Sequence, residues 1–315
     1  MKSVIINQND ADQRLDKFLS KYLPSLPQSM MYKGIRKKRI KINGKRAQIN
    51  QILCVGDVVD MYINDEFFLR QDTDEPYKTL KPSLNIVYED ENIILMDKPP
   101  GMIVHEDDGE KVNTLINHMK AYLFHKGEWN PDDENSFVPA LCNRIDRNTA
   151  GIVIGAKNAM SLRIINEKIK KREIKKYYLC LVMGHIEQTS GTLEGYLEKD
   201  SEKNRVYIHG KPSKNTKTIR TRYRVLRKNT LTDLVEVELL TGRTHQIRAH
   251  FASIGHPLAG DGKYGTNELN KKIGMKTQAL YSYKLQFDFS DENELSYLNG
   301  KVFKVKNVPF ADINC

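Results

Sequence analysis

The sequence is poor in the residues and runs that mark several large classes of protein. Its 315 residues include only four cysteines, which are widely spaced and form no CxxC pair. A disulfide framework or a zinc site needs more closely grouped cysteines, so this pattern favours a reducing cytosol. No apolar run approaches the roughly 20 residues that span a bilayer, and the first residues contain no apolar segment typical of a secretion signal. We therefore expect a cytoplasmic protein that does not engage a membrane.

The sequence also lacks the short motifs of the common cofactor and metal enzymes. It contains no Walker loop, no GxGxxG after a strand, no GxSxG and no HExxH. His245 and His250 suggest a metal at first sight, but no third ligand stands at a recognisable spacing. We therefore predict neither a cofactor nor a metal, and any chemistry must come from ordinary side chains.

Positive charge, in contrast, is in excess. The 50 lysines and arginines outnumber the 40 aspartates and glutamates, which gives a net charge of +10 and a pI near 9.2. Such an excess favours a polyanionic partner, most simply a nucleic acid, although charge alone leaves open that the chain binds none. We expect the chain to act as a monomer on this partner.

The pattern of residues 1–63 predicts a small basic module. Apolar residues at helical spacing predict a helix over 14–23, and a second helix follows that Ser29 can cap. Asn43-Gly44 between alternating segments is a strong hairpin signal, and Gly56-Asp57 marks a further turn. A helix–helix–hairpin unit is therefore expected.

Seven cations gather where the second predicted helix meets the hairpin. They are Arg36, Lys37, Lys38, Arg39, Lys41, Lys45 and Arg46. A solvated helix end would be the simpler explanation, because cations are also favoured there by the helix dipole. We favour a phosphate-binding face, whose contacts would be insensitive to base sequence and weakened by salt. The pattern resembles an S4 RNA-binding domain, with matching residues at Arg14-Leu15-Asp16, Ile42-Asn43-Gly44-Lys45 and Gly56-Asp57.

The rest of the chain reads as a linker and one large domain. Residues 64–82 lose periodicity and gather Asp, Glu and Pro, which predicts a flexible linker. We assign residues 83–315 to the large domain. It opens with two apolar runs around a polar EDEN turn, which predict a hairpin, and the segment 115–125 predicts a helix.

The first candidate site in the large domain is the segment 143–151. It places Asp146 between Arg144 and Arg147, before a small-residue turn and a buried strand over 152–156. Neighbouring cations favour the ionised form of a carboxylate, and a strand end holds a side chain rigidly. Taken alone, an aspartate in a surface ion pair would be the simpler explanation.

Two further stretches carry candidate residues. The segment 171–185 predicts a strand in which Tyr177 or Tyr178 turns toward the core. The segment 235–265 predicts a strand and then a helix with Thr244 as its N-cap, and Gly255 ends that helix. The residues expected on its core face are Ile247, Phe251 and Ile254. Those clustered at its start, where backbone N–H groups favour anions, are Arg243, His245 and Arg248.

These stretches, in this order and spacing, resemble the RluA-type pseudouridine synthases. The matching residues are Asp97-Lys98-Pro99-Pro100-Gly101 with Val104-His105, Asn143-Arg144-Ile145-Asp146, Lys176 with Tyr178 to Gly184, and Gly242–His250. The resemblance covers about residues 84–290, and its last motif is highly specific.

The resemblance implies that uridines in RNA are isomerised to pseudouridine: the bond between uracil N1 and C1′ breaks, the base turns, and C5 joins C1′. It implies that Asp146 attacks or deprotonates the nucleotide and that Tyr178 stacks on the base and removes the C5 proton. Arg243 would pair with Asp146. Arg144 would help to displace the base from its stack, where a cation can fill the gap, and we expect Arg248 to bind RNA.

The resemblance also implies an α+β fold, with a mixed, mainly antiparallel central sheet and flanking helices after a small S4-like α/β domain. The S4-like domain favours large-subunit ribosomal RNA as the substrate. A synthase for transfer RNA and a non-catalytic RNA-binding or ribosome-assembly protein remain alternatives. The chain departs from the family at Asn143, which is usually histidine, and at Leu280-Tyr281-Ser282, which is usually Leu-His-Ala. Neither position is expected to carry the bond chemistry.

Overall fold

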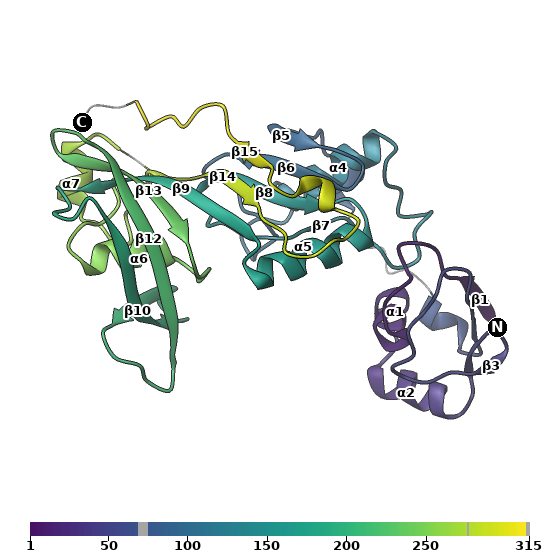
Figure 1. Cartoon of the computed structure of the whole chain (residues 1–315). Helices are drawn as coiled ribbons and strands as arrows, with labels where there is room; N and C mark the ends of the chain where they lie inside the picture. Colours follow the sequence, from purple (N-terminus) through teal and green to yellow (C-terminus); the bar gives the residue numbers. More distant parts are fainter. Residues whose placement is uncertain (69–74, 276, 313–315) are drawn as a thin grey trace. The chain divides into compact units, whose positions relative to one another are not determined.

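The computed structural model describes residues 1–68, 75–275 and 277–312. They form two compact units. The N-terminal unit comprises Met1–Pro82, Asn117–Ala140 and Ala156–Arg163, and the sheet unit comprises Ser83–Ile116, Leu141–Gly155 and Ile164–Cys315. Figure 1 shows the elements of both in sequence colours.

The N-terminal unit begins with the predicted helix–helix–hairpin module. Its elements are β1 (Lys2–Ile5), α1 (Leu15–Tyr22), α2 (Gln28–Arg36), β2 (Ile40–Ile42), β3 (Lys45–Arg46) and β4 (Val58–Met61), and the sheet order is β1-β4-β2-β3. The hairpin prediction is confirmed, because Asn43 and Gly44 join β2 to β3 with φ angles of 52° and 71°. Two adjacent left-handed residues are what a tight hairpin turn requires.

The predicted cap of the second helix is wrong. Pro27, and not Ser29, is the N-cap of α2, and Ser29 lies inside the first turn without capping it. The proline ring holds φ near −58°, and ψ is 138°, so the chain is extended at Pro27 and turns helical directly after it.

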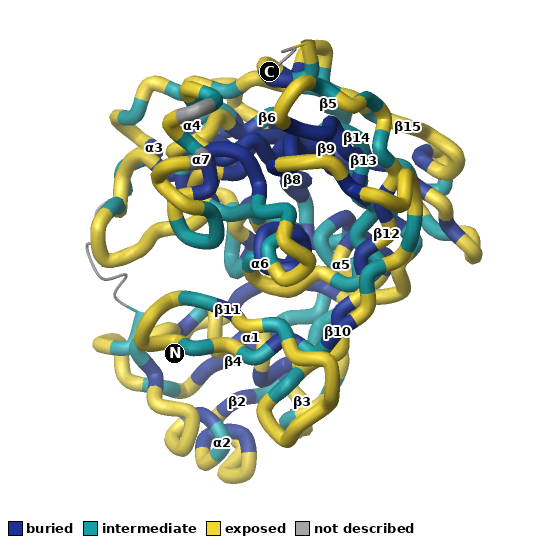
Figure 2. Tube along the Cα trace, turned by 90° about the vertical axis from the view of Figure 1, so that its left-hand side faces the viewer, coloured by how far each residue is buried: buried dark blue, intermediate teal, exposed yellow. Residues whose placement is uncertain are grey.

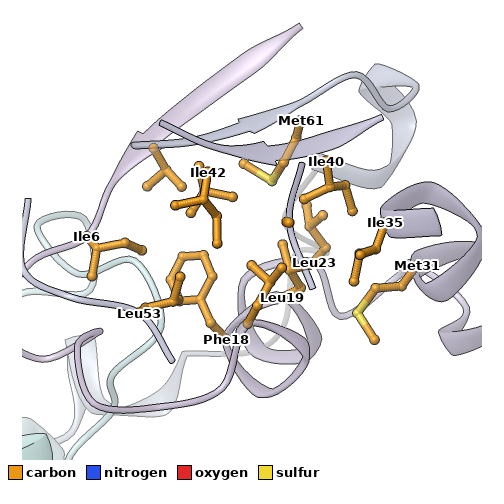
Figure 3. Packing of buried hydrophobic residues seen from close by; sticks show 14 of the residues in the cluster. Ile6, Phe18, Leu19, Leu23, Met31, Ile35, Ile40, Ile42, Leu53 and Met61 are labelled. Carbon is orange, nitrogen blue, oxygen red and sulfur yellow. The ribbon is translucent and has the colours of Figure 1, made fainter. Parts of the chain in front are cut away.

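One apolar core holds this module together (Figure 3). The helices contribute Leu15, Phe18, Leu19, Met31 and Ile35, and the strands contribute Ile40, Ile42 and Met61, all buried. The helical spacing predicted an apolar face of Leu15, Phe18, Leu19 and Tyr22 on the first helix. The first three are buried, which confirms the prediction for them, while Tyr22 is only half-buried.

The predicted linker is partly helical. Residues 65–68 form the short helix η1 (Asp65–Phe68), residues 69–74 lie outside the described residues, and α3 (Pro76–Thr79) follows. Tyr77 on α3 is buried, and its ring packs edge-on against Phe124 and Trp129 at centroid distances of 5.8 and 5.2 Å. The prediction of a flexible linker is therefore wrong for residues 76–79.

Polar contacts also join the N-terminal module to the segment 117–140 within the same unit. The carboxylate of Asp10 is fully buried and accepts hydrogen bonds from Asn135 Nδ2 and Ser136 Oγ, each at 2.6 Å. Asn9 Nδ2 donates to Glu134 Oε1 at 2.6 Å. Composition did not predict this arrangement, because it joins positions more than 120 residues apart.

The sheet unit is built on an eleven-stranded sheet. Its order is β11-β10-β12-β13-β9-β14-β8-β6-β5, with β15 on β14 and β7 on β8. The strands are β5 (Ile86–Glu89), β6 (Ile93–Lys98), β7 (Ala140–Leu141), β8 (Ala150–Ala156), β9 (Ile174–Met183), β10 (Ser190–Asp200), β11 (Arg205–His209), β12 (Thr216–Lys228), β13 (Thr232–Leu239), β14 (Leu280–Phe287) and β15 (Val302–Lys304). The remaining helices of the chain are α4 (Leu115–His125) and α5 (Ala159–Lys171), which both units share, and α6 (Gln246–Ser253), α7 (Asn267–Lys272) and η2 (Ser296–Leu298) of the sheet unit.

The predicted mixed, mainly antiparallel sheet is confirmed. The pairs from β11 through β13, β9 and β14 are antiparallel, as is the β5–β6 hairpin, whereas β14 and β8 are parallel. Every residue of β8 is buried, and Figure 2 shows the central strands in dark blue. These strands supply the rigid floor on which the candidate site is built.

A close approach between β8 and β14 determines where the Asp146 segment lies. Gly151 pairs with Ser282 and has a φ of 115°. A Cβ atom at Gly151 would lie 2.2 Å from the carbonyl oxygen of Ser282, so only glycine fits. Ser282 also pairs with Tyr178 on β9. The turn before β8, Ser282 and Tyr178 are therefore brought together.

Candidate active site

Asp146 lies in the turn that precedes β8 and is bonded to the buried side of helix α6. Its Oδ2 atom accepts a hydrogen bond from Arg248 Nη1 at 3.1 Å and lies 3.8 Å from His245 Nε2. The side chain of Asp146 keeps 27% of its exposure, whereas that of Arg248 keeps 9%. The carboxylate is therefore held from the protein side and open to a ligand on the other.

Arg248 is held in turn by a second carboxylate. Its Nε and Nη2 atoms donate to the two oxygens of Asp261 at 2.7 and 3.0 Å, and Asp261 is fully buried. Asp261 also accepts the backbone N–H groups of Lys263 and Tyr264. Burial opposes the charge of Arg248, but the two aspartates outweigh it and raise its pKa. One guanidinium thus fixes the position of Asp146 from a rigid anchor.

The prediction that Arg243 pairs with Asp146 is corrected by this geometry. Helix α6 begins at Gln246, and its N-cap is His245 in the left-handed conformation, with a φ of 53°, rather than Thr244. Arg243 therefore precedes the helix and is exposed, and among the described residues it makes no ion pair. Arg248 lies on the first turn and reaches the carboxylate instead.

The late start of α6 has a local cause in the side chain of Gln246. Its Oε1 atom accepts hydrogen bonds from Thr241 Oγ1 at 2.9 Å and from the N–H of Arg243 at 3.1 Å. Its Nε2 atom donates to Thr221 Oγ1 and to the carbonyl of Arg220 on β12, each at 3.0 Å. These bonds hold residues 241–245 in a loop against the sheet.

The end of α6 agrees with the sequence pattern, except at one apolar residue. Gly255, with a φ of 86°, follows the helix as predicted, and Ile247 and Phe251 are buried. Ile254 is not on the core face: it is the C-cap residue and keeps 40% of its exposure. The reason is that the last turn has already left the helical path at this position.

His245 is a site residue to which the sequence pattern assigned no role. Its Nδ1 atom bonds to the hydroxyl of Tyr264 at 3.0 Å, while Nε2 faces Asp146. Burial lowers the pKa of His245, the charge of Asp146 opposes this shift, and Arg248 adds to it. His245 therefore lies between the carboxylate of Asp146 and the hydroxyl of Tyr264.

Tyr178 lies on the face of the sheet that α6 covers. Its ring belongs to the apolar cluster of Ile247 and Phe251, and the residue pairs with Ser282 on the neighbouring strand β14. Burial raises the pKa of Tyr178 to about 12, with a further contribution from the charge of Asp146. Its neighbour Tyr177 is only half-buried, with the ammonium of Lys284 3.9 Å from its ring centre. Of the two tyrosines, only Tyr178 has a pKa that is raised by the charge of Asp146.

Lys98 holds the backbone next to Asp146, a role that was not predicted from the sequence. It is fully buried, and its Nζ atom donates to the carbonyls of Pro99, Met102 and Arg147 at 2.9, 2.8 and 3.0 Å. Burial lowers the pKa of Lys98 to about 8, although the charges of Asp146 and Asp97 oppose the shift. The sequence pattern that could have identified Lys98 is the segment Asp97–Gly101. The role of Lys98 there is structural, because it holds three backbone carbonyls.

The two departures from the family pattern both make defined contacts. The hydroxyl of Tyr281 donates to Asp97 Oδ1 at 2.8 Å, and burial raises the pKa of Asp97. Asn143 Oδ1 accepts the N–H of Ile154 at 2.8 Å, and its buried Nδ2 makes no hydrogen bond within the described part of the chain. These residues shape the loops beside Asp146 rather than contacting it.

The remaining predicted RNA-binding residues lie in two places. Arg144 is exposed beside Asp146 in the sheet unit. In the N-terminal unit, the exposed cations are Arg36, Lys37, Lys38, Arg39 and Lys45, whereas Lys41 is half-buried with its ammonium 5.3 Å from the ring centre of Tyr62. Lys38 has a φ of 60°, which ends α2 and turns the chain sharply within this run of cations. Within the described residues, none of these side chains forms an ion pair.

A cavity of about 510 Å³ lies beside the Asp146 site. Its lining residues are Asn148, Lys203, Arg205, Tyr207, Arg248, Gly262 and Lys263. Because Arg248 bonds to Asp146, the cavity adjoins the carboxylate, and four of its seven lining residues are cations. It suits a polyanionic ligand.

Among the described residues, no group of three histidine, cysteine, aspartate or glutamate side chains is placed to hold a metal ion. No helix in the same part of the chain has the length and apolar character needed to cross a membrane.

Comparisons with known proteins agree on one family. The model of the RNA pseudouridylate synthase family matches residues 92–253, and that of the S4 domain matches residues 13–59. An uncharacterized RNA pseudouridine synthase of Mycoplasma capricolum subsp. capricolum is 34% identical over 310 residues, 98% of either chain. Ribosomal large subunit pseudouridine synthase C of Escherichia coli (strain K12) is 30% identical over 307 residues, 94% of this chain and 91% of that one.

The solved structures add a likeness of fold. Human RNA Pseudouridylate Synthase Domain Containing 1 matches 68% of this chain and 83% of its own, with a TM-score of 0.55 and 24% identity. Human RNA Pseudouridylate Synthase Domain Containing 4 matches 72% of this chain and 89% of its own, with a TM-score of 0.56 and 20% identity.

Proposed function

The chain belongs to the RNA pseudouridylate synthase family, and we propose that it modifies a specific uridine of large-subunit ribosomal RNA. The resemblance predicted from its motifs is confirmed, and its activity is that of an RNA pseudouridine synthase, an isomerase. Ribosomal RNA as the substrate is supported by relatives such as synthase C of Escherichia coli, which match nearly the whole chain, and by the S4 domain.

We assign the chemistry to Asp146, and the observation that carries this assignment is its position. It is the carboxylate that is partly open to solvent beside a cationic cavity and is bonded to an arginine whose own place is fixed by Asp261. The N–H groups of Arg248 leave the second oxygen of Asp146 available to attack or deprotonate the nucleotide. During the reaction the N1–C1′ bond breaks and the C5–C1′ bond forms.

Tyr178 and Arg144 would handle the base. With its pKa raised to about 12, Tyr178 is a neutral phenol near pH 7, so we propose that its ring stacks on the uracil. A uridine inside structured RNA must first leave its stack, and the exposed Arg144 would occupy the gap.

We further propose a division of labour along the chain. Residues 1–63 would bind RNA phosphates through the cations at the end of α2, and residues 83–315 would perform the reaction. The protein would work as a monomer in the cytoplasm, where ribosomal RNA is made and assembled. Neither a cofactor nor a metal enters this proposal, because uridine isomerisation exchanges one bond for another within the same nucleotide.

Mapping of pseudouridine, site by site, in the ribosomal and transfer RNA of cells that lack this protein tests the proposal. Parallel cultures are complemented with wild type or with Asp146→Asn. We expect one site, or a few, in large-subunit ribosomal RNA to vanish and to return only with the wild type. Loss of a transfer-RNA site instead would refute the substrate assignment. Purified wild type that binds RNA but modifies no uridine would refute the enzymatic role.

A further inference from the structure

One cation in the cavity beside Asp146 differs from the others in having neither an ion pair nor a side-chain hydrogen bond within the described residues. Arg248 is bonded to Asp146 and Asp261. Lys203 lies 3.9 Å from Asp200. Lys263 donates to the carbonyl of Asn204 at 2.6 Å. Arg205, on β11, forms no ion pair and donates no side-chain hydrogen bond within the described residues.

Arg205 is nevertheless held in place by aromatic rings. Its guanidinium carbon lies 5.1 Å from the ring centre of Tyr264 and 6.0 Å from that of Tyr207. A guanidinium beside aromatic faces keeps its N–H groups directed outward in its own plane, where they remain available for hydrogen bonds. The side chain is therefore oriented without being neutralised.

The position of Arg205 is coupled to the reacting carboxylate through Tyr264. The hydroxyl of Tyr264 accepts the N–H of Val206, next to Arg205 on β11, at 2.9 Å. The same hydroxyl bonds to His245 Nδ1 at 3.0 Å, and His245 Nε2 lies 3.8 Å from Asp146. Within the sheet unit, Tyr264 and His245 therefore lie between Arg205 and Asp146.

We propose that Arg205 binds one phosphodiester of the RNA next to the target uridine and so sets the register of the nucleotide against Asp146. This inference rests on the proposed function. An arginine fork matches the two free oxygens of a phosphodiester, and none of the residues that line the cavity is acidic. The 510 Å³ volume lies within the range of pockets that hold small ligands, which suits a nucleotide rather than a whole helix.

The chemistry of the lining favours a phosphate over a second base at this place. Lys203 and Lys263 add two further positive charges around Arg205, and a neutral base would gain little from them. A phosphodiester would gain a charge-assisted bond to Arg205 and the long-range attraction of both lysines. Arg205 is therefore assigned to binding and register, and the bond chemistry stays with Asp146.

Kinetics on a transcript that spans the mapped uridine test this assignment. Arg205→Gln removes the charge, Arg205→Lys keeps the charge but not the fork, and Arg222→Gln is the control, because Arg222 is an exposed cation paired with Glu238 at 2.7 Å. We expect Arg205→Gln to raise KM about tenfold and to lower kcat by a smaller factor, because the nucleotide loses both a contact and its register against Asp146. Arg205→Lys should fall between the two, and Arg222→Gln should match wild type.

Phosphate ethylation of the same transcript identifies the contact. With wild type, ethylation at one linkage beside the target should inhibit modification, and with Arg205→Gln that single inhibition should disappear while others remain. An unchanged interference pattern, a KM equal to that of Arg222→Gln, or a loss confined to kcat would each overturn the assignment. If wild type modifies no uridine in the transcript or in cellular RNA, the proposed function itself fails, which is a different result.

Discussion

In the N-terminal unit, the cations at the end of α2 are exposed and unpaired within the described residues, whereas in the sheet unit Arg248 is buried between two aspartates. An exposed cation contributes to the attraction of a polyanion, and its contribution is additive and screened by salt. A buried arginine with two carboxylate partners contributes geometry, because it cannot move without breaking three short hydrogen bonds.

Because of this difference, we expect the exposed cations to determine the affinity for RNA and the buried Arg248 to determine the rate of the reaction. Loss of exposed cations should weaken binding and leave the bound RNA correctly placed against Asp146. Loss of the buried arginine should free Asp146 and leave Asp261 without its partner, while the N-terminal cations still attract RNA.

Among the residues that surround Asp146 or bind RNA, the largest effect is expected for Arg248→Gln. The change leaves Asp261 buried and uncompensated, so unfolding free energy should fall by about 3–5 kcal/mol. Activity should fall by about 10²–10³-fold, because Asp146 loses the donor that positions it. Urea unfolding and single-turnover assays measure the two effects. Arg243→Gln is the control, and its stability should stay within about 0.5 kcal/mol of wild type. A greater loss of activity for Arg243→Gln than for Arg248→Gln would contradict this account.

A combined replacement of Arg36, Lys37, Lys38 and Arg39 by alanine should act on binding alone. At about 150 mM salt we expect affinity to fall by about 10–100-fold, and the dependence of log affinity on log salt to become shallower by up to about three. The rate at saturating RNA should not change. Filter binding across a salt series measures the effect, with Arg222→Gln and Arg224→Gln, whose cations are paired with glutamates, as controls. An unchanged salt dependence would refute the assigned role of these cations.

Activity should fall as pH rises through about 8, because Lys98, whose pKa is lowered to about 8, then loses its proton. A neutral amine has two N–H groups for three carbonyls, so the segment that carries Asp146 should loosen.

The free energy of unfolding should change in the opposite direction. Between about pH 8 and 10 the unfolded chain binds a proton that the folded chain does not, so this burial cost is relieved as pH rises. A pH–rate profile measures the first effect. Lys98→Met should be weakly active at every pH and lack this alkaline decline; a wild-type rate that stays constant to about pH 9.5 would exclude the effect.

The smallest effect is expected for Tyr281→Phe. The change removes the hydrogen bond to Asp97, a carboxylate whose pKa burial already raises, and should cost about 1–2 kcal/mol of stability. Activity should stay within about threefold, because Tyr281 does not contact Asp146. Tyr281→His, which introduces the residue usual in the family, should lie closer to wild type. Thermal unfolding measures the difference, and a Phe variant as stable as wild type would show that this bond is dispensable.

Local patterns of the sequence predicted much of the fold. The apolar spacing in residues 14–23, the Asn43-Gly44 turn and the hairpin around the EDEN turn all form as expected, because each depends on residues that are neighbours in the chain. The resemblance to the family implied that Asp146 and Tyr178 act at one site, and both lie in the same region of the sheet unit. Periodicity and turn chemistry thus predicted the local elements, whereas the two site residues were implied by the resemblance to the family.

Contacts between distant residues account for what the sequence could not predict. The choice between Arg243 and Arg248 depends on where α6 starts, and Gln246 sets that start by bonding to Arg220 and Thr221, about 25 residues away. The anchor of Arg248 is Asp261, and Lys98 reaches the carbonyl of Arg147 across 49 positions. No local sequence pattern predicts such bonds. The sequence therefore indicated the motif Gly242–His250 but not which of its arginines bonds to Asp146.

The central claim is that Asp146 performs the reaction while other groups hold the RNA. Its most direct test is a comparison of wild type and Asp146→Asn by single-turnover kinetics at saturating transcript, with the dissociation constant measured in parallel. The account predicts that Asp146→Asn binds the transcript within about threefold of wild type and slows pseudouridine formation by at least about 10³-fold. A variant that keeps a tenth of the wild-type rate, or one that has lost binding instead of rate, would contradict the account.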